Sequence, residues 1–139
     1  MTASSVTVSA TIAPPRSEPR RIAPLPRAFA DLQHFVPEYA LESEEQRFAK
    51  LHAIDYETLA RFYAEMLPRL DAILEHLSHC RLSAMSPSDK TLFDLTMTMV
   101  ETSHPMDLGW GATDFPGAYR WDAFEFATIS TVSKAKVVA

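Results

Sequence analysis

Three side chains that can bind a metal ion stand close together in the sequence, at His76, His79 and Cys80. On an α-helix, residues three and four positions apart share a face, so these groups could meet one ion. Zinc binds imidazole and thiolate, but it would need a further ligand from another segment. The candidates elsewhere in the chain are His52, His104 and Asp107. Paired Cys-x-x-Cys ligands and a His-Glu-x-x-His motif are absent, so histidine capping of a helix C-terminus is the competing interpretation.

Catalysis by the same residue types is a second hypothesis. Cys80 with His76 one turn behind it would pair a nucleophile with a base, although a lone cysteine on an apolar helix is also typical of inert packing. His104 beside Asp107 and Asp114 would form an acid–base group at a loop mouth. The alternative function is therefore a small metal- or cofactor-dependent enzyme, with its site between the long helix and the glycine loop 109–117. Its residues would be His76, His79, His104 and Asp107.

The histidines and the cysteine end an amphipathic stretch that begins near Leu59. Its apolar residues recur every three or four positions, which predicts one helix from 56 to about 80 with Asp55 as its N-cap. Pro68 lies inside this stretch and removes a backbone hydrogen bond, so we expect a kink or, alternatively, two helices. A row of alternating charge indicates a solvated polar face: Glu57, Arg61, Glu65 and Arg69.

Two further helix starts can be read from local capping signals. Ser43 and Gln46 have the spacing of a capping box, which predicts a helix over 44–53. Ser86 followed by Pro87 gives an N-cap and a proline at the first helical position, which predicts a helix from 87 to about 103. The apolar faces of this last helix are broad, which indicates a central position or an oligomer contact.

The ends of the chain differ from its middle. Five prolines between Pro14 and Pro26 predict an extended arm, and Pro37 limits the apolar run from Phe29 to a short helical turn. We expect a flexible arm at 1–27, one helical domain at 28–127 and a flexible tail at 128–139. The predicted class is all-α: a small bundle of three main helices plus short helical segments, with the arm and an aromatic-rich C-terminal segment.

Composition and charge exclude several classes of protein. The 139 residues are 47% hydrophobic and 22% charged, and no apolar run approaches the roughly 20 residues of a membrane span. The net charge is -5, but both ends are basic, so the body carries about -10 and should repel nucleic acid. We therefore expect no nucleic-acid partner and no membrane insertion. Because no secretion signal is visible and Cys80 is the single cysteine, we expect a cytoplasmic location.

The aromatic residues gather near the C-terminus, around the three glycines Gly109, Gly111 and Gly117. Such a segment is either a lid on the core or a recognition surface. Because every catalytic pattern is incomplete, we expect a non-enzymatic interaction protein that self-associates or serves as an accessory subunit, without a cofactor. Its partner would be a second copy or another protein. The predicted contact residues are Trp110, Phe115, Tyr119, Trp121, Met97 and Met99.

Overall fold

A computed structural model of the chain describes residues 21–114, 123 and 125–126. Within these residues every regular element is helical, which confirms the all-α class. The elements are η1 (Arg27–Phe35), α1 (Val36–Tyr39), α2 (Glu44–Ala53), α3 (Tyr56–Met66), η2 (Leu67–Arg69), α4 (Leu70–Ser78), η3 (Leu82–Ala84), α5 (Pro87–Glu101) and α6 (His104–Asp107), where η marks a 3-10 helix. The predicted tail and most of the predicted arm lie outside the described residues. None of the described helices combines the length and apolar character needed to cross a bilayer.

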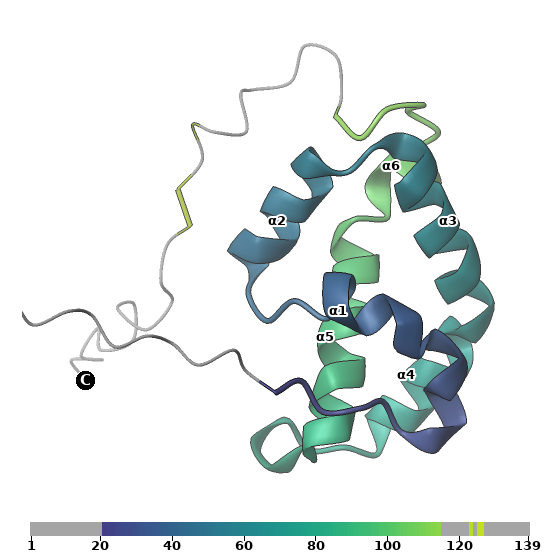
Figure 1. Cartoon of the computed structure of the whole chain (residues 1–139), viewed down its shortest axis with the longest axis vertical. Coiled ribbons are helices and arrows are strands. Elements are labelled where there is room, and N and C mark those ends of the chain that lie inside the picture. The colour runs from purple at the N-terminus through teal and green to yellow at the C-terminus, as the bar shows by residue number, and fades with distance from the viewer. Residues whose placement is uncertain (1–20, 115–122, 124, 127–139) are drawn as a thin grey trace, which may run out of the picture.

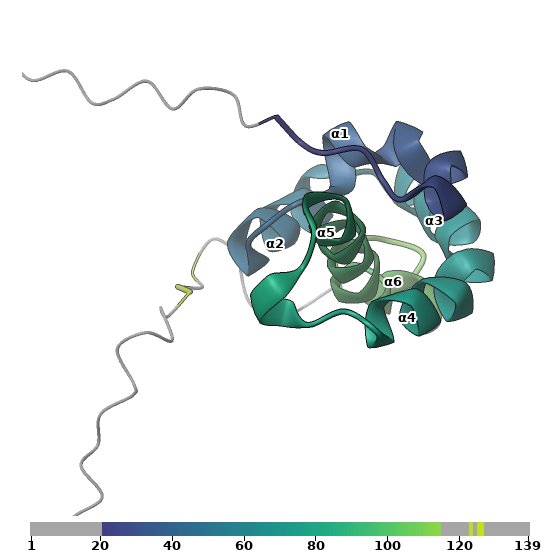
Figure 2. The same cartoon turned by 90° about the horizontal axis from the view of Figure 1, so that it is seen from below.

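Helix α5 occupies the centre of the fold (Figure 1). A view nearly along its axis shows α1, α2, α3 and α4 arranged around it (Figure 2), and each of these helices contacts it. Of the two explanations for its broad apolar faces, the structure thus favours a central position. The buried apolar side chains are Leu25, Phe29, Leu32, Phe35, Val36, Tyr39, Leu59, Phe62, Met66, Ile73, Leu92, Leu95 and Met99.

The predicted caps start the helices where expected. Ser43 forms the full capping box with Gln46 at the start of α2. Asp55 accepts a hydrogen bond from the backbone N–H of Thr58 at the start of α3, and Ser86 accepts one from Asp89 at the start of α5. Each cap satisfies a backbone donor that has no partner within its helix, so these starts depend on neighbouring residues alone.

The long stretch that was predicted as one helix is interrupted at Pro68. The long stretch is an α-helix, then the 3-10 turn η2, then a second α-helix, and it ends at Ser78. Leu67, just before Pro68, keeps α-helical angles of φ -56° and ψ -46°, and the backbone departs from them at Arg69, with φ -94° and ψ -12°. Beyond this turn Ile73 is buried, whereas Leu74, predicted on the same apolar face, is 50% exposed.

Two other prolines start helices rather than ending them. Pro37 was expected to stop the apolar run from Phe29, but it lies in the first turn of α1, where its missing N–H costs nothing. Pro105 likewise lies in the first turn of α6. The prediction for Pro37 was wrong because a proline is tolerated at a helix N-terminus.

Part of the charged row along α3 and η2 holds η1 in place. His34 Nε2 lies 3.1 Å from Glu65 Oε2, and Arg69 Nε lies 3.1 Å from Asp31 Oδ2. These pairs are partly solvated, and each contributes at most about 1 kcal/mol to stability. Their effect is to align two segments that are far apart in the sequence.

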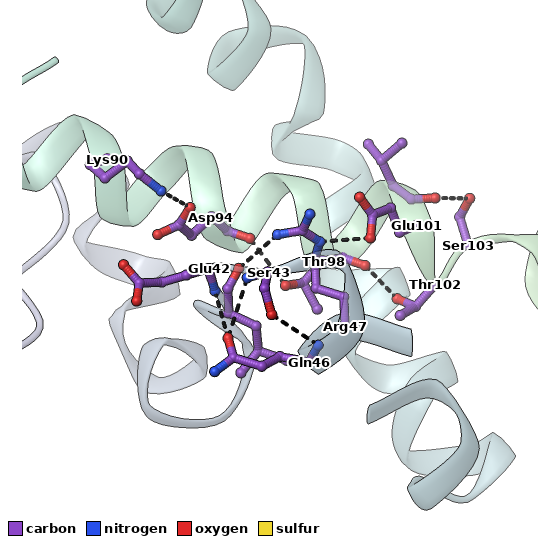
Figure 3. A network of polar contacts seen from close by, with 12 residues as sticks. Glu42, Ser43, Gln46, Arg47, Lys90, Asp94, Thr98, Glu101, Thr102 and Ser103 are labelled. Carbon is purple, nitrogen blue, oxygen red and sulfur yellow. Dashed lines mark hydrogen bonds and ion pairs between the residues drawn. The ribbon is translucent and has the colours of Figure 1, made fainter. Parts of the chain in front are cut away.

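A buried arginine joins α2 to α5 (Figure 3). Arg47 donates from Nε to Glu101 Oε2 at 2.6 Å and from Nη1 to the Leu41 carbonyl at 2.9 Å. In the same region Thr98 and Thr102 each donate to the carbonyl four residues earlier, at 3.0 and 2.7 Å. The threonines of α5 therefore satisfy their hydroxyls within the helix, which lets them lie in the interior despite their β-branched side chains.

Candidate functional site

The structure brings His76, Cys80 and Asp89 together. His76 lies in the last turn of α4, Cys80 follows the end of that helix, and Asp89 lies in the first turn of α5. One ligand atom from each residue lies within 4.8 Å of the others, and all three side chains are half-buried. Within the described residues, this is the one such group of His, Cys, Asp or Glu side chains.

Asp89 is the member that the sequence did not point to as a ligand. The carboxylate serves as a first-turn acidic residue of α5, as its position predicts. Its distance of nine residues from Cys80 spans the short η3 turn, which folds the start of α5 back onto the end of α4. One signal in the sequence could have indicated Asp89 as a ligand. The first helix ends and the second begins with residues that can bind a metal, and the connection between them is short.

Hydrogen bonds hold the Asp89 carboxylate from both sides. Its Oδ1 lies 2.6 Å from His76 Nε2, and its Oδ2 accepts a hydrogen bond from Ser86 Oγ at 2.7 Å. Ser86 Oγ also accepts the Asp89 backbone N–H at 3.1 Å, so the helix cap and the cluster share residues. The cap that starts α5 therefore also orients the carboxylate toward His76.

The pKa values of the two acidic groups of the cluster are shifted in opposite directions. Hydrogen bonds from His76 and then Ser86 lower the pKa of Asp89, so this carboxylate is charged near neutral pH. Partial burial, followed by the nearby Asp89 charge, raises the pKa of the Cys80 thiol. A thiol with a raised pKa is a poor nucleophile, because the thiolate is the reactive form. The environment of Cys80 therefore offers no support for the Cys80–His76 nucleophile hypothesis.

An aromatic side chain packs against the imidazole. The rings of Phe29 and His76 meet edge to face, with centroids 5.4 Å apart and an interplanar angle of 80°. On Phe29, the Arg69 guanidinium lies 5.2 Å from the ring centroid. Because Phe29 is buried in the core, this contact limits the rotation of His76 and covers one side of the cluster.

His79 does not join the cluster. Its side chain is 74% exposed, and its Nδ1 donates to the Glu75 carbonyl at 2.8 Å near the end of α4. This geometry agrees with the capping interpretation of a histidine at a helix C-terminus. The two histidines of α4 thus differ, since one contacts α5 and the other caps its own helix.

Of the remaining predicted ligands, His104 and Asp107 lie beyond the C-terminal end of α5, and His52 lies in α2. His104 lines an open cavity of about 240 Å³ with Glu101 and residues of α2, and Asp107 accepts a hydrogen bond from the Tyr63 hydroxyl. His52 stacks edge to face on Phe48 within α2. Asp89 lies in the first turn of the 15-residue helix α5, and His104 lies beyond its other end; the helix is about 22 Å long. His76, His79, His104 and Asp107 therefore do not converge on one site.

The predicted contact residues fall in different environments. Gly109 and Gly111 have φ angles of 62° and 69°, so the loop does use backbone angles that favour glycine, and Trp110 between them is half-buried. Met97 is half-buried, whereas Met99 is 3% exposed and packs in the core. The other three contact residues, Phe115, Tyr119 and Trp121, lie outside the described residues.

Comparison with known proteins identified no relative: no family model matches the chain, and neither the curated proteins nor the solved structures include a match.

Proposed function

We propose that this chain is a non-enzymatic interaction protein that associates with a second copy of itself. The observation that supports the proposal is an apolar strip on the outside of the fold, formed by Ala60, Ala64, Leu67 and Leu74 and named here the outer face. Leu67 and Leu74 are 46% and 50% exposed, and they stand seven residues apart. Successive positions along this strip differ by three, four and seven residues, the spacing of a helix-pairing seam.

The charges beside the outer face favour a second copy as its partner. Arg61 lies toward one end of the face, and Asp71 and Glu75 lie toward the other; all three are exposed. A two-fold axis near Pro68 would run the two faces antiparallel, which places Arg61 of each copy opposite Glu75 of the other. In a two-fold symmetric interface each contact between two different residues occurs twice, once in each half. The two ends of the face must therefore complement each other in charge.

Two finer features belong to the same proposal. The helical stretches 44–53, 56–78 and 87–101 act as a small bundle that presents the outer face. The aromatic residues Trp110, Phe115, Tyr119 and Trp121 supply further contacts to the partner, as does Met97. Met99 is left out of these contacts because its side chain packs in the core. Trp110→Ala should weaken association by about 2 kcal/mol if Trp110 is an anchor.

Sedimentation equilibrium of the full chain at several concentrations tests the outer face. We expect a dimer, and Leu74→Gln should weaken its association at least about tenfold because it places an amide in the apolar strip. Leu82→Gln is the matched control, since Leu82 is an exposed leucine in η3, away from the strip. An unchanged association constant for Leu74→Gln would rule out this face.

A charge exchange tests the antiparallel arrangement. Arg61→Glu should weaken association, because it places two acidic groups opposite each other in each half of the interface. The double variant Arg61→Glu with Glu75→Arg should restore association, since it exchanges the charges of the pair. A concentration-independent monomer in the unsubstituted protein, or failure of the double variant to recover, would contradict the arrangement.

A further inference from the structure

We propose that His76, Cys80 and Asp89 form a binding site for a divalent transition-metal ion, and that Zn²⁺ suits them best. The geometry carries the proposal, since one imidazole nitrogen, one sulfur and one carboxylate oxygen lie within 4.8 Å of one another. Tetrahedral zinc with bonds of about 2.0 to 2.3 Å separates its ligand atoms by about 3.5 Å. His76 Nε2 and Asp89 Oδ1, now 2.6 Å apart, would separate to that spacing as the ion replaces the hydrogen bond between them.

The chemistry of the three donors selects the class of ion. A thiolate, a carboxylate and a neutral imidazole together carry two negative charges, which balance a divalent cation in a half-buried position. Sulfur and nitrogen donors favour Zn²⁺ over Mg²⁺ or Ca²⁺, which prefer oxygen ligands. On binding, the Cys80 thiol gives up its proton to solvent and the sulfur bonds to the metal. The proton that His76 Nε2 donates to Asp89 is also lost from that nitrogen, so that Nε2 offers its lone pair to the metal and Nδ1 carries the remaining ring proton.

The surroundings orient two of the three ligands. Ser86 holds the second oxygen of the Asp89 carboxylate at 2.7 Å, which leaves the first directed toward His76. Phe29 packs on the imidazole with a centroid distance of 5.4 Å and restricts its rotation. Such outer contacts commonly change metal affinity by about 10- to 100-fold. Three protein ligands leave one tetrahedral position for water.

Because of its position between two helices, a bound ion would stabilise the fold. His76 and Cys80 belong to the end of α4 and Asp89 to the start of α5, and η3 lies between them. An ion bound to all three would cross-link two helices and fix the connection. Because the ion binds the folded chain, it should raise the melting temperature, and the increase should grow with the logarithm of its concentration above the dissociation constant.

The test uses the full chain, freed of metal with a chelator and kept reduced, and titrated with Co²⁺ and then Zn²⁺. Co²⁺ bound by Cys80 should produce a thiolate-to-cobalt charge-transfer band and the visible bands of tetrahedral cobalt, both abolished when Zn²⁺ replaces it. We expect one ion per chain and a higher melting temperature with Zn²⁺. Absence of the charge-transfer band at saturating Co²⁺ would overturn the proposal.

Substitutions identify the ligands. Cys80→Ser should remove the charge-transfer band and weaken Zn²⁺ binding at least about tenfold, and Ser86→Ala should weaken it by about tenfold through the carboxylate. His79→Ala is the matched control, since His79 is an exposed histidine on the same helix end, and it should leave affinity unchanged. Binding that is equally weakened by His79→Ala and His76→Gln would overturn the assignment.

Circular dichroism of each variant separates loss of the site from loss of the fold. If Cys80→Ser does not fold, His76→Gln and Asp89→Asn replace it, with Zn²⁺ affinity by competition against a chromophoric chelator as the measurement. Both should lose at least about tenfold in affinity, because each removes one ligand. Unchanged affinity in both variants would overturn the site.

Discussion

Arg47 and Glu101 form an ion pair with an Nε to Oε2 distance of 2.6 Å, although 54 residues separate them in the sequence. The Arg47 side chain is 9% exposed and that of Glu101 is 28% exposed, so the pair is largely shielded from solvent. The remaining described contact of Arg47, to the Leu41 carbonyl, places its guanidinium at the start of α2. One side chain thus links α2, the loop before it and the end of α5.

Removal of this arginine should destabilise the fold. Arg47→Met keeps much of the apolar stem but leaves the Glu101 carboxylate and the Leu41 carbonyl without their donor, so we expect a loss of about 2 kcal/mol in unfolding free energy. Urea denaturation measures this change. Arg81→Met, which removes an exposed arginine before η3, should change stability by less than about 0.5 kcal/mol. Equal effects of the two substitutions would contradict the role of the buried pair.

Ionisation of Asp55 should contribute stability that is lost in acid. Hydrogen bonds from the Thr58 side chain and backbone lower the pKa of this carboxyl in the folded protein. The contribution is therefore fully present above the unfolded-state pKa of about 3.9 and is lost as the pH falls through the lower folded-state value. Asp55→Asn keeps a capping side chain without the charge. The melting-temperature difference between the two proteins should shrink below pH about 4; a constant difference would contradict the prediction.

The two methionines of α5 should respond differently to truncation. Met99→Ala should lower the unfolding free energy by about 3 kcal/mol, because Met99 is buried and its removal leaves a cavity. Met97→Ala should cost less, since Met97 is half-buried. Denaturation and sedimentation on both variants separate stability from association. Normal stability with weakened association for Met99→Ala would show that this residue acts at an interface instead.

The contact between Tyr63 and Asp107 should weaken in alkali. The hydrogen bond to Asp107 raises the pKa of Tyr63, so the folded protein holds the phenolic proton more tightly than the unfolded chain does. Its contribution to stability is present below the unfolded-state pKa of about 10 and is lost as the pH rises through the folded-state value. The advantage of the unsubstituted protein over Tyr63→Phe in thermal melts should therefore narrow above pH about 10. A melting-temperature difference between the two proteins that stays constant from pH 8 to 11 would contradict the prediction.

The sequence by itself determined the all-α class and the starts of the main helices. Ser43 with Gln46, Asp55 with Thr58 and Ser86 with Asp89 each make their contacts within three residues. Such contacts depend on local backbone geometry and need no distant partner, which is why spacing predicts them.

Only the tertiary structure decided which side chains share a site and which face solvent. After the interruption at Pro68, Ile73 is buried and Leu74 is exposed, although both were predicted on one apolar face. His76 contacts Asp89 because η3 folds the start of α5 back onto the end of α4, whereas His104 lies beyond the other end of α5. These outcomes depend on the orientation of each helix about its axis and on the packing between distant segments. Both result from small changes in backbone geometry that add up along the chain.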